Sequence, residues 1–172
     1  METNAEQTTN VTPSDFLNLK GIEYFMFEED FMENNIRCIP MVIRFKLDRV
    51  GIKLKLSEWT RFSREEKIGL ALINCNNNQE VRKYTSHLTT LIKKYTSKTP
   101  EILETARIPS WDELKLIPEI LNEKLKEFGW HLSIEQWISL TDLQRFALLK
   151  LCRPGHENKN FPKAMKEFNL VD

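Results

Sequence analysis

Residues 151–161, LCRPGHENKNF, place several chemically capable side chains in one short stretch where an apolar helical pattern ends. Cys152 and His156 are separated by three residues, a spacing that could suit a metal or a thiolate–imidazole pair. A structural zinc site needs about four ligands and a catalytic one about three, yet neither CxxC nor HExxH occurs in the chain. The Pro154-Gly155 turn gives the two side chains no reason to converge. We therefore predict no metal site and expect Cys152 to end its helix as an apolar residue.

The polar residues of this loop have two interpretations that the sequence leaves open. They could fasten the loop to the body of the protein through charge-assisted hydrogen bonds, or they could present a recognition surface. The candidate binding residues of the loop are Arg153, His156, Glu157, Asn158 and Asn160. We predict no catalytic residue, because the chain has no G-x-S-x-G elbow, no Gly-rich phosphate loop and no helix with paired catalytic carboxylates. No motif indicates a cofactor.

A second candidate surface follows from the charge pattern near the start of the chain. Residues 23–33 hold five acidic side chains and no basic one, whereas residues 37–55 hold six Lys or Arg and one Asp. A basic face there could bind an acidic partner or nucleic acid, with Arg37, Arg44 and Arg49 as candidate residues. The pattern favours the alternative that the acidic segment folds over the basic helix, or that both are solvated. The net charge of zero also argues against nucleic-acid binding.

The composition predicts the fold class that must position these residues. The 172 residues include 5 Gly and 7 Pro, too few breakers for many strands and turns, so we predict an all-α, mainly helical protein. No apolar run reaches the roughly 20 residues of a membrane helix, and the polar N-terminus does not resemble a signal peptide. We expect residues 1–20 to be disordered. Three widely spaced cysteines are typical of reduced thiols, which predicts a cytoplasmic protein.

An internal repeat is the strongest pattern in the chain. Residues 36–73 align with residues 114–151 at a constant offset of 78, and eight of the 38 positions are identical, against about two expected by chance from ordinary residue frequencies. The identical pairs include Pro40 and Pro118 as well as Trp59 and Trp137. This similarity predicts an ancient duplication, and hence two tandem helical repeats packed into one globular domain.

Each repeat is expected to have the same order of elements. A helix begins near Pro40 or Pro118, a glycine ends it, and a short alternating stretch (52–56 or 130–134) predicts an extended connector. Ser63-x-x-Glu66 and Thr141-x-x-Gln144 predict capping boxes that open a longer helix, and Ser110-x-x-Glu113 offers one more. Residues 79–96 predict a third helix in the first repeat, with a shorter counterpart starting near Phe161. The predicted organisation is therefore one domain over 21–172, with repeats at about 36–96 and 114–170 and a linker at 97–109.

Two long motifs carry a family resemblance. The run FEEDFMENNIRCIPMVIRFKLDRVGIKLKLSEW and the run LQRFALLKLCRPGHENKNF resemble the nitrate reductase-associated protein family over roughly residues 22–170. The family's name reflects genes found beside those for nitrate reductase and molybdenum-cofactor synthesis. The family resemblance fixes no reaction, but together with the absence of a catalytic constellation it predicts a non-catalytic accessory or interaction protein whose partner is nitrate reductase or a cofactor-insertion protein. The alternative is a small-molecule- or metal-binding protein or enzyme that uses Cys152, Arg153, His156 and Glu157. Whether the chain forms a homo-oligomer is left open.

Overall fold

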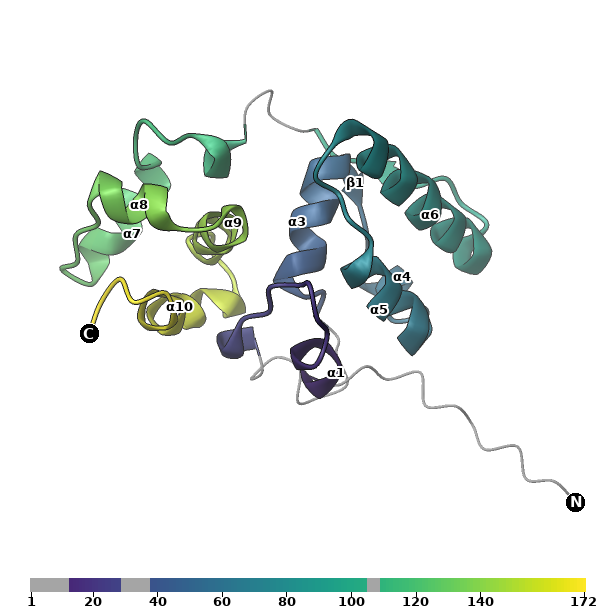
Figure 1. The fold of residues 1–172 in the computed structure, drawn as a ribbon, viewed down its shortest axis with the longest axis horizontal. Helices are drawn as coiled ribbons and strands as arrows, with labels where there is room; N and C mark the ends of the chain where they lie inside the picture. The colour runs from purple at the N-terminus through teal and green to yellow at the C-terminus, as the bar shows by residue number, and fades with distance from the viewer. Residues whose placement is uncertain (1–12, 29–37, 105–108) are drawn as a thin grey trace, which may run out of the picture. The chain divides into compact units, whose positions relative to one another are not determined.

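The computed structural model of the chain describes residues 13–28, 38–104 and 109–172, although the side chains of 13, 14, 156 and 157 lie outside the description. The described residues are mainly helical, as predicted, and their one sheet is a two-stranded antiparallel pair (Figure 1). The chain divides into two compact units. Unit 1 comprises residues 1–24 and 28–103, and unit 2 comprises residues 25–27 and 104–172. No helix among the described residues is long and apolar enough to cross a membrane.

Unit 1 is built around the helix α3. Its described elements are α1 (Pro13–Leu17), α3 (Met41–Val50), β1 (Ile52–Lys53), α4 (Leu56–Trp59), α5 (Arg64–Leu72), α6 (Asn78–Thr96) and β2 (Glu101–Ile102). Helix α3 packs against α5 and α6, and α4 also packs against α6. The core contains the fully buried side chains of Trp59, Phe62, Leu70, Tyr84 and Leu88. The long α6 confirms the helix predicted from the apolar spacing of residues 79–96.

Unit 2 is built around the helix α9. Its described elements are the 3₁₀ helix η2 (Ser110–Asp112), α7 (Glu119–Glu127), α8 (Ile134–Ser139), α9 (Asp142–Leu151), the 3₁₀ helix η3 (His156–Asn160) and α10 (Phe161–Glu167). Helix α9 packs against η2, α7, η3 and α10. The core contains the buried side chains of Trp137, Phe146, Leu148, Phe161 and Met165. One further 3₁₀ helix, η1 (Met26–Glu28), gives its first two residues to unit 2 and its last to unit 1.

The predicted capping boxes open α5 and α9. Ser63 accepts a hydrogen bond from the Glu66 N–H at 3.2 Å, and the Glu66 carboxylate accepts one from the Ser63 N–H at 2.8 Å. Thr141 and Gln144 repeat both contacts at 3.2 and 2.9 Å. The box predicted at Ser110 is wrong, because Pro109 precedes a single 3₁₀ turn without a side-chain cap. The chain becomes extended at Glu113, so no α-helix follows there for a cap to open.

The helices of the two units begin at a constant spacing. The starts of α3 and α7, of α4 and α8, and of α5 and α9 each lie 78 residues apart. Pro40 and Pro118 are the N-cap residues of α3 and α7, so each helix begins one residue after its proline. Gly51 and Gly129 follow the ends of these helices with φ of 68° and 67°, in the left-handed region that glycine enters without a Cβ penalty. Helices α3 and α7 are therefore both followed by a glycine in the left-handed region.

Buried cations also connect the elements within each unit. The Lys46 ammonium donates hydrogen bonds to the carbonyls of Ala71 and Ile73 at 2.5 and 2.6 Å, at the end of α5. Burial lowers the pKa of Lys46 to about 8, although nearby Cys75 and Glu80 act to raise it. In unit 2, the Arg145 guanidinium donates to the carbonyl of Trp111 at 2.8 Å. These cations thus supply hydrogen-bond donors to backbone carbonyls in the interior of their units.

Candidate functional site

The loop at residues 153–160 leaves α9 at the surface of unit 2 and returns to its interior. Arg153, Pro154 and Gly155 are exposed, Asn158 is half-buried, and Asn160 is completely buried. Residues 156–160 form η3, and Phe161 continues directly into α10. The structure therefore separates the predicted binding residues of the loop into an outer and an inner group.

Asn160 belongs to the inner group and holds another segment of unit 2 in place. Its Nδ2 donates a hydrogen bond to the Phe27 carbonyl at 3.1 Å, between residues 133 positions apart in the chain. The side-chain Oδ1 is buried without a hydrogen-bond partner among the described residues. One end of the loop is thus a structural fastening, because the amide satisfies a backbone acceptor in a buried position.

The segment that Asn160 holds, Phe25–Phe27, is also bound by α10. The Glu167 carboxylate accepts hydrogen bonds from the N–H groups of Met26 and Phe27 at 2.7 and 2.9 Å. The rings of Phe25 and Phe27 pack edge-on against Phe168, with centroids 4.9 and 6.1 Å away. Both phenylalanines are buried, so they anchor this segment in the core of unit 2.

The outer group is the exposed part of the loop. Arg153 and Lys159 are both exposed and carry positive charge. The side chains of His156 and Glu157 lie outside the described residues, so their predicted binding role stays a prediction. The described part of the outer loop therefore carries two exposed cations on either side of a Pro-Gly turn.

The environment of Cys152 does not favour a nucleophile. The side chain is 9% exposed, and burial raises the pKa of the thiol to about 12, although nearby Lys124 acts to lower it. Burial also raises the pKa of the Cys75 thiol in unit 1. A reactive cysteine needs a lowered pKa and access to solvent. Among the side chains that the structure describes, no three His, Cys, Asp or Glu residues are grouped as metal ligands would be.

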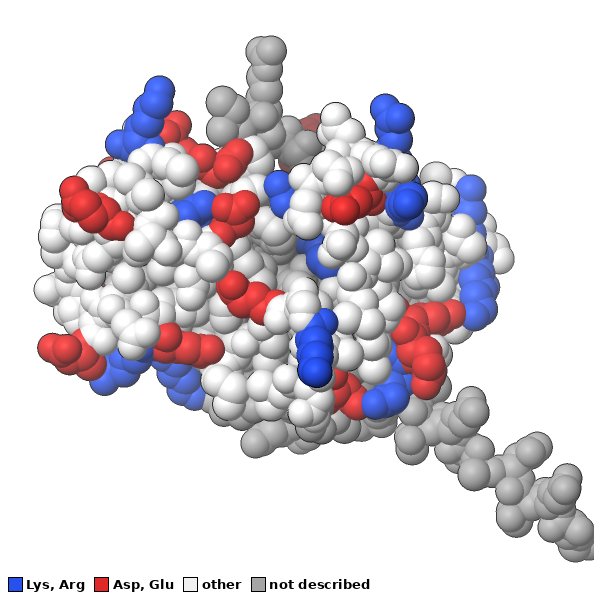
Figure 2. All heavy atoms as spheres, viewed as in Figure 1, with Lys and Arg blue, Asp and Glu red and all other residues white. Residues whose placement is uncertain are grey.

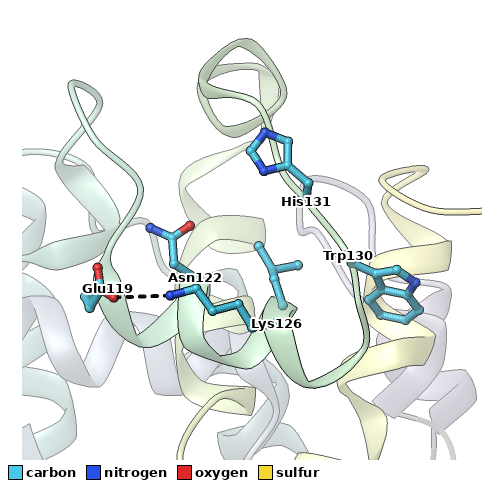
Figure 3. Close-up of a pocket in the computed structure, with 6 residues that line it drawn as sticks. Glu119, Asn122, Lys126, Trp130 and His131 are labelled. Atoms are coloured by element: carbon cyan, nitrogen blue, oxygen red, sulfur yellow. Dashed lines mark ion pairs between the residues drawn. The ribbon is translucent and has the colours of Figure 1, made fainter.

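A small pocket in unit 2 was not predicted from the sequence. It has a volume of about 180 Å³ and lies between α7 and the connector that follows it. Its lining residues are Glu119, Asn122, Leu125, Lys126, Trp130 and His131. Figure 3 shows Glu119, Asn122 and Lys126 along α7, with an ion pair of 4.0 Å joining the two charged groups. The lining combines an aromatic surface with an imidazole, an amide and two opposite charges.

Aromatic contacts connect this pocket to the end of the loop. The Trp130 ring stacks on Phe128 with centroids 4.7 Å apart, and it lies 6.5 Å from the ring of Phe161. Phe161 immediately follows Asn160, the buried end of the loop. The sequence feature that could have indicated this pocket is the pair Trp130-His131. Both residues lie beside a glycine in the predicted extended connector, and each combines an aromatic ring with a polar N–H group.

The predicted basic face in unit 1 is less exposed than its composition indicates. Arg37 lies outside the described residues, and Arg44 and Arg49 are half-buried. The Arg49 guanidinium lies over the Phe45 ring, 5.2 Å from its centroid, and Lys46 is buried. In the view of Figure 2, basic and acidic side chains alternate and neither forms a continuous patch. The binding role of these arginines stays a prediction.

Comparison with protein families gives a match over most of the chain. Residues 24–168 match the family model described as conserved nitrate reductase-associated protein, which confirms the resemblance seen in the two long motifs. No curated protein and no solved structure matches the chain significantly.

Proposed function

This chain belongs to the conserved nitrate reductase-associated protein family, and from this premise we propose that it is a non-catalytic accessory protein of nitrate assimilation. Its proposed partner is nitrate reductase or a protein that inserts the reductase's cofactor. The proposed contact is the outer loop of unit 2, from Arg153 to Lys159. The observation that carries the proposal is an exposed cationic loop whose far end is fastened by the buried Asn160.

The fastening favours recognition because it lowers the entropy that binding must remove. A free loop loses about 0.5–1.5 kcal/mol for each side chain and a comparable amount for each backbone residue that a partner immobilises. Here α9 fixes one end of the loop, while Asn160 and the first turn of α10 fix the other. The exposed Arg153 and Lys159 are therefore presented from a short loop whose two ends are both fixed, which favours a rigid binding site.

The proposal is tested by co-purification from the native host grown on nitrate. The bait is the chain carrying Arg153→Glu and Lys159→Glu, compared with the wild type and with Lys166→Glu. Lys166 is an exposed lysine of α10 in the same unit, so this variant controls for a charge reversal outside the loop, at half the change in net charge of the loop variant. Nitrate reductase or a cofactor-insertion protein should be recovered with the wild type and with Lys166→Glu, but not with the loop variant. Equal recovery with all three baits would place the contact elsewhere and sink the loop assignment.

We also propose that units 1 and 2 descend from one duplicated helical unit. The constant spacing of three helix starts, the two left-handed glycines and the two capping boxes support this origin. The buried cations support it too, because Lys46 and Lys67 in unit 1 stand 78 residues before Lys124 and Arg145 in unit 2, and all four are buried. A relative whose two halves align with each other across these positions would strengthen the duplication proposal. A relative that matches this chain well only in its first half would weaken it.

The proposed setting is the cytoplasm. All three cysteines are free thiols, and two of them are buried, which is typical of proteins in reducing compartments. Fractionation of the native host with an antibody against the chain tests this setting, and recovery in an oxidising compartment would overturn it.

A further inference from the structure

The inference begins with the way unit 1 completes its connector. In unit 1, the residues after α3 form β1, which pairs in antiparallel fashion with β2. Ile52 lies opposite Ile102 and Lys53 lies opposite Glu101. The Leu103 N–H donates to the Gly51 carbonyl at 2.8 Å. Because hydrogen-bonded pairs alternate along an antiparallel ladder, 51/103 and 53/101 are the bonded pairs and 52/102 is not.

Charge adds to this pairing in unit 1. The Glu101 carboxylate lies 3.0 Å from the Lys53 ammonium and 3.1 Å from that of Lys55. These cations hold the pKa of the Glu101 carboxyl below its ordinary value, chiefly through the hydrogen bond from Lys53. The occupant of the β1 edge is therefore an extended segment with an apolar residue beside an acidic one.

Unit 2 has the same connector without an occupant. Gly129, Trp130 and His131 stand 78 residues after Gly51, Ile52 and Lys53, between α7 and α8. The Trp130 N–H bonds back to the Leu125 carbonyl at 3.0 Å. No described residue forms a hydrogen bond with the Gly129 carbonyl or with the N–H and C=O of His131. Within the part of unit 2 that the structure describes, no strand pairs with this connector.

The side chains at these positions also indicate an open edge in unit 2. Ile52 is 1% exposed, whereas Trp130 is half-buried and His131 is exposed. The pocket of about 180 Å³ opens beside the unpaired edge and is lined by both residues. Figure 3 shows His131 on this connector, above the face of α7 that carries Asn122 and Lys126. An unpaired edge next to an aromatic-lined pocket is the arrangement that accepts an added strand.

We propose that the connector Gly129–His131 of unit 2 is a docking edge for an extended peptide segment of a partner protein. The segment pairs antiparallel with the connector, as β2 pairs with β1, and it carries an apolar residue opposite Trp130 and an acidic residue opposite His131. The imidazole and the Lys126 ammonium line the same pocket and favour the acidic side chain, which competes with Glu119 for Lys126. The inference rests on the proposed function for the kind of partner, which is a protein, and it adds the segment that the partner contributes.

The test uses the full chain and a synthetic peptide with the sequence of residues 99–104, acetyl-TPEILE-amide, which contains β2. The peptide is titrated into ¹⁵N-labelled chain and followed by the amide signals of His131 and the indole signal of Trp130. We expect saturable shifts at both positions. Methylating the peptide nitrogen that corresponds to Glu101 removes a ladder donor and should weaken binding about fivefold or more.

Two matched peptides make the outcome specific. Methylating the nitrogen that corresponds to Ile102 should change the affinity far less, because that N–H points away from the edge in a non-bonded pair. Replacing the acidic residue by lysine, Glu101→Lys, should weaken binding because the charge now repels Lys126. Equal affinity of the two methylated peptides would overturn strand pairing.

Three further outcomes overturn the proposal. The absence of any shift removes the edge as a docking site. Shifts confined to Ile52 and Lys53 would mean that the peptide exchanges with β2 in unit 1. Shifts of His131 that depend on chain concentration alone would assign the edge to a second copy of this chain. Because the titration contains no nitrate reductase, its failure is separate from the failure of the loop contact, which the co-purification tests by itself.

Discussion

Replacing Asn160 by alanine distinguishes the fastening end of the loop from its outer end. The substitution removes the hydrogen bond of 3.1 Å to the Phe27 carbonyl and leaves that carbonyl buried without its donor. A stranded buried acceptor costs about 1–3 kcal/mol, while loss of the unpartnered Oδ1 returns about 1 kcal/mol. The expected loss in free energy of unfolding is therefore up to about 2 kcal/mol. For exposed Arg153→Ala, the expected change is below about 0.5 kcal/mol.

The assay is urea unfolding followed by circular dichroism, with Asn160→Asp as a second variant of the same size. The carboxylate that this second variant introduces can accept but cannot donate a hydrogen bond while it is ionised, so Asn160→Asp should be less stable than Asn160→Ala at neutral pH. Acidification should restore part of this loss, because a protonated carboxyl regains a donor toward Phe27. Partner recovery, measured in parallel, should fall for the outer loop variant although its stability is unchanged.

The opposite ranking would refute the reasoning. If Arg153→Ala lost more than about 1 kcal/mol and Asn160→Ala lost nothing, the exposed arginine would be the fastening and the buried amide would be dispensable. An Asn160→Asp variant whose stability does not respond to acid would show that the donor toward Phe27 is unimportant.

Three other predictions concern stability and reactivity. Burial lowers the pKa of Lys46 from 10.5 to about 8, so the folded state binds fewer protons than the unfolded state between these pH values. The unfolding free energy of the wild type, measured relative to Lys46→Met, should therefore rise by about 2 kcal/mol from about pH 7 to pH 9.5. Parallel stability curves for the two proteins would contradict this. Gly129→Ala, at φ of 67° with open space around it, should lose about 1 kcal/mol in urea unfolding, whereas Gly69→Ala in the open interior of α5 should gain up to about 1 kcal/mol. Cys152, with a pKa of about 12, should react with iodoacetamide at pH 8 at least about 100-fold more slowly folded than in urea; comparable rates would show that the thiol is accessible.

Much of the helical framework is predictable because local chemistry determines it. The capping boxes that begin at Ser63 and Thr141 consist of side chain–backbone hydrogen bonds between residues of one four-residue segment. They therefore form independently of the tertiary arrangement. The glycines at 51 and 129 need a left-handed φ that few other residues adopt. The apolar spacing of residues 79–96 predicts α6, since a long amphipathic pattern allows few other structures.

The candidate sites were less predictable because their properties depend on distant residues. Asn160 reads as a polar loop residue, yet it is buried by its contact with Phe27, 133 residues earlier. The sequence places Lys46 in a basic segment, but its ammonium donates hydrogen bonds to two carbonyls at the end of α5. The pocket beside Trp130 requires α7 and its connector to be placed together. Charge and polarity along the chain carry no record of such contacts.

The contrast between the two connectors gives a reason to look for binding in unit 2. The same turn after a left-handed glycine leads to Ile52-Lys53 in one unit and to Trp130-His131 in the other. In unit 1, the chain supplies its own strand, and a buried isoleucine with a paired lysine completes the edge. In unit 2, a large aromatic and an imidazole occupy these positions and remain accessible. A protein that needed the second edge only for its own stability would gain more from an apolar residue that buries completely than from a half-buried tryptophan. Tryptophan is among the residues enriched at binding hot spots, so the contrast between the two connectors favours recognition at the unit that leaves its edge unpaired.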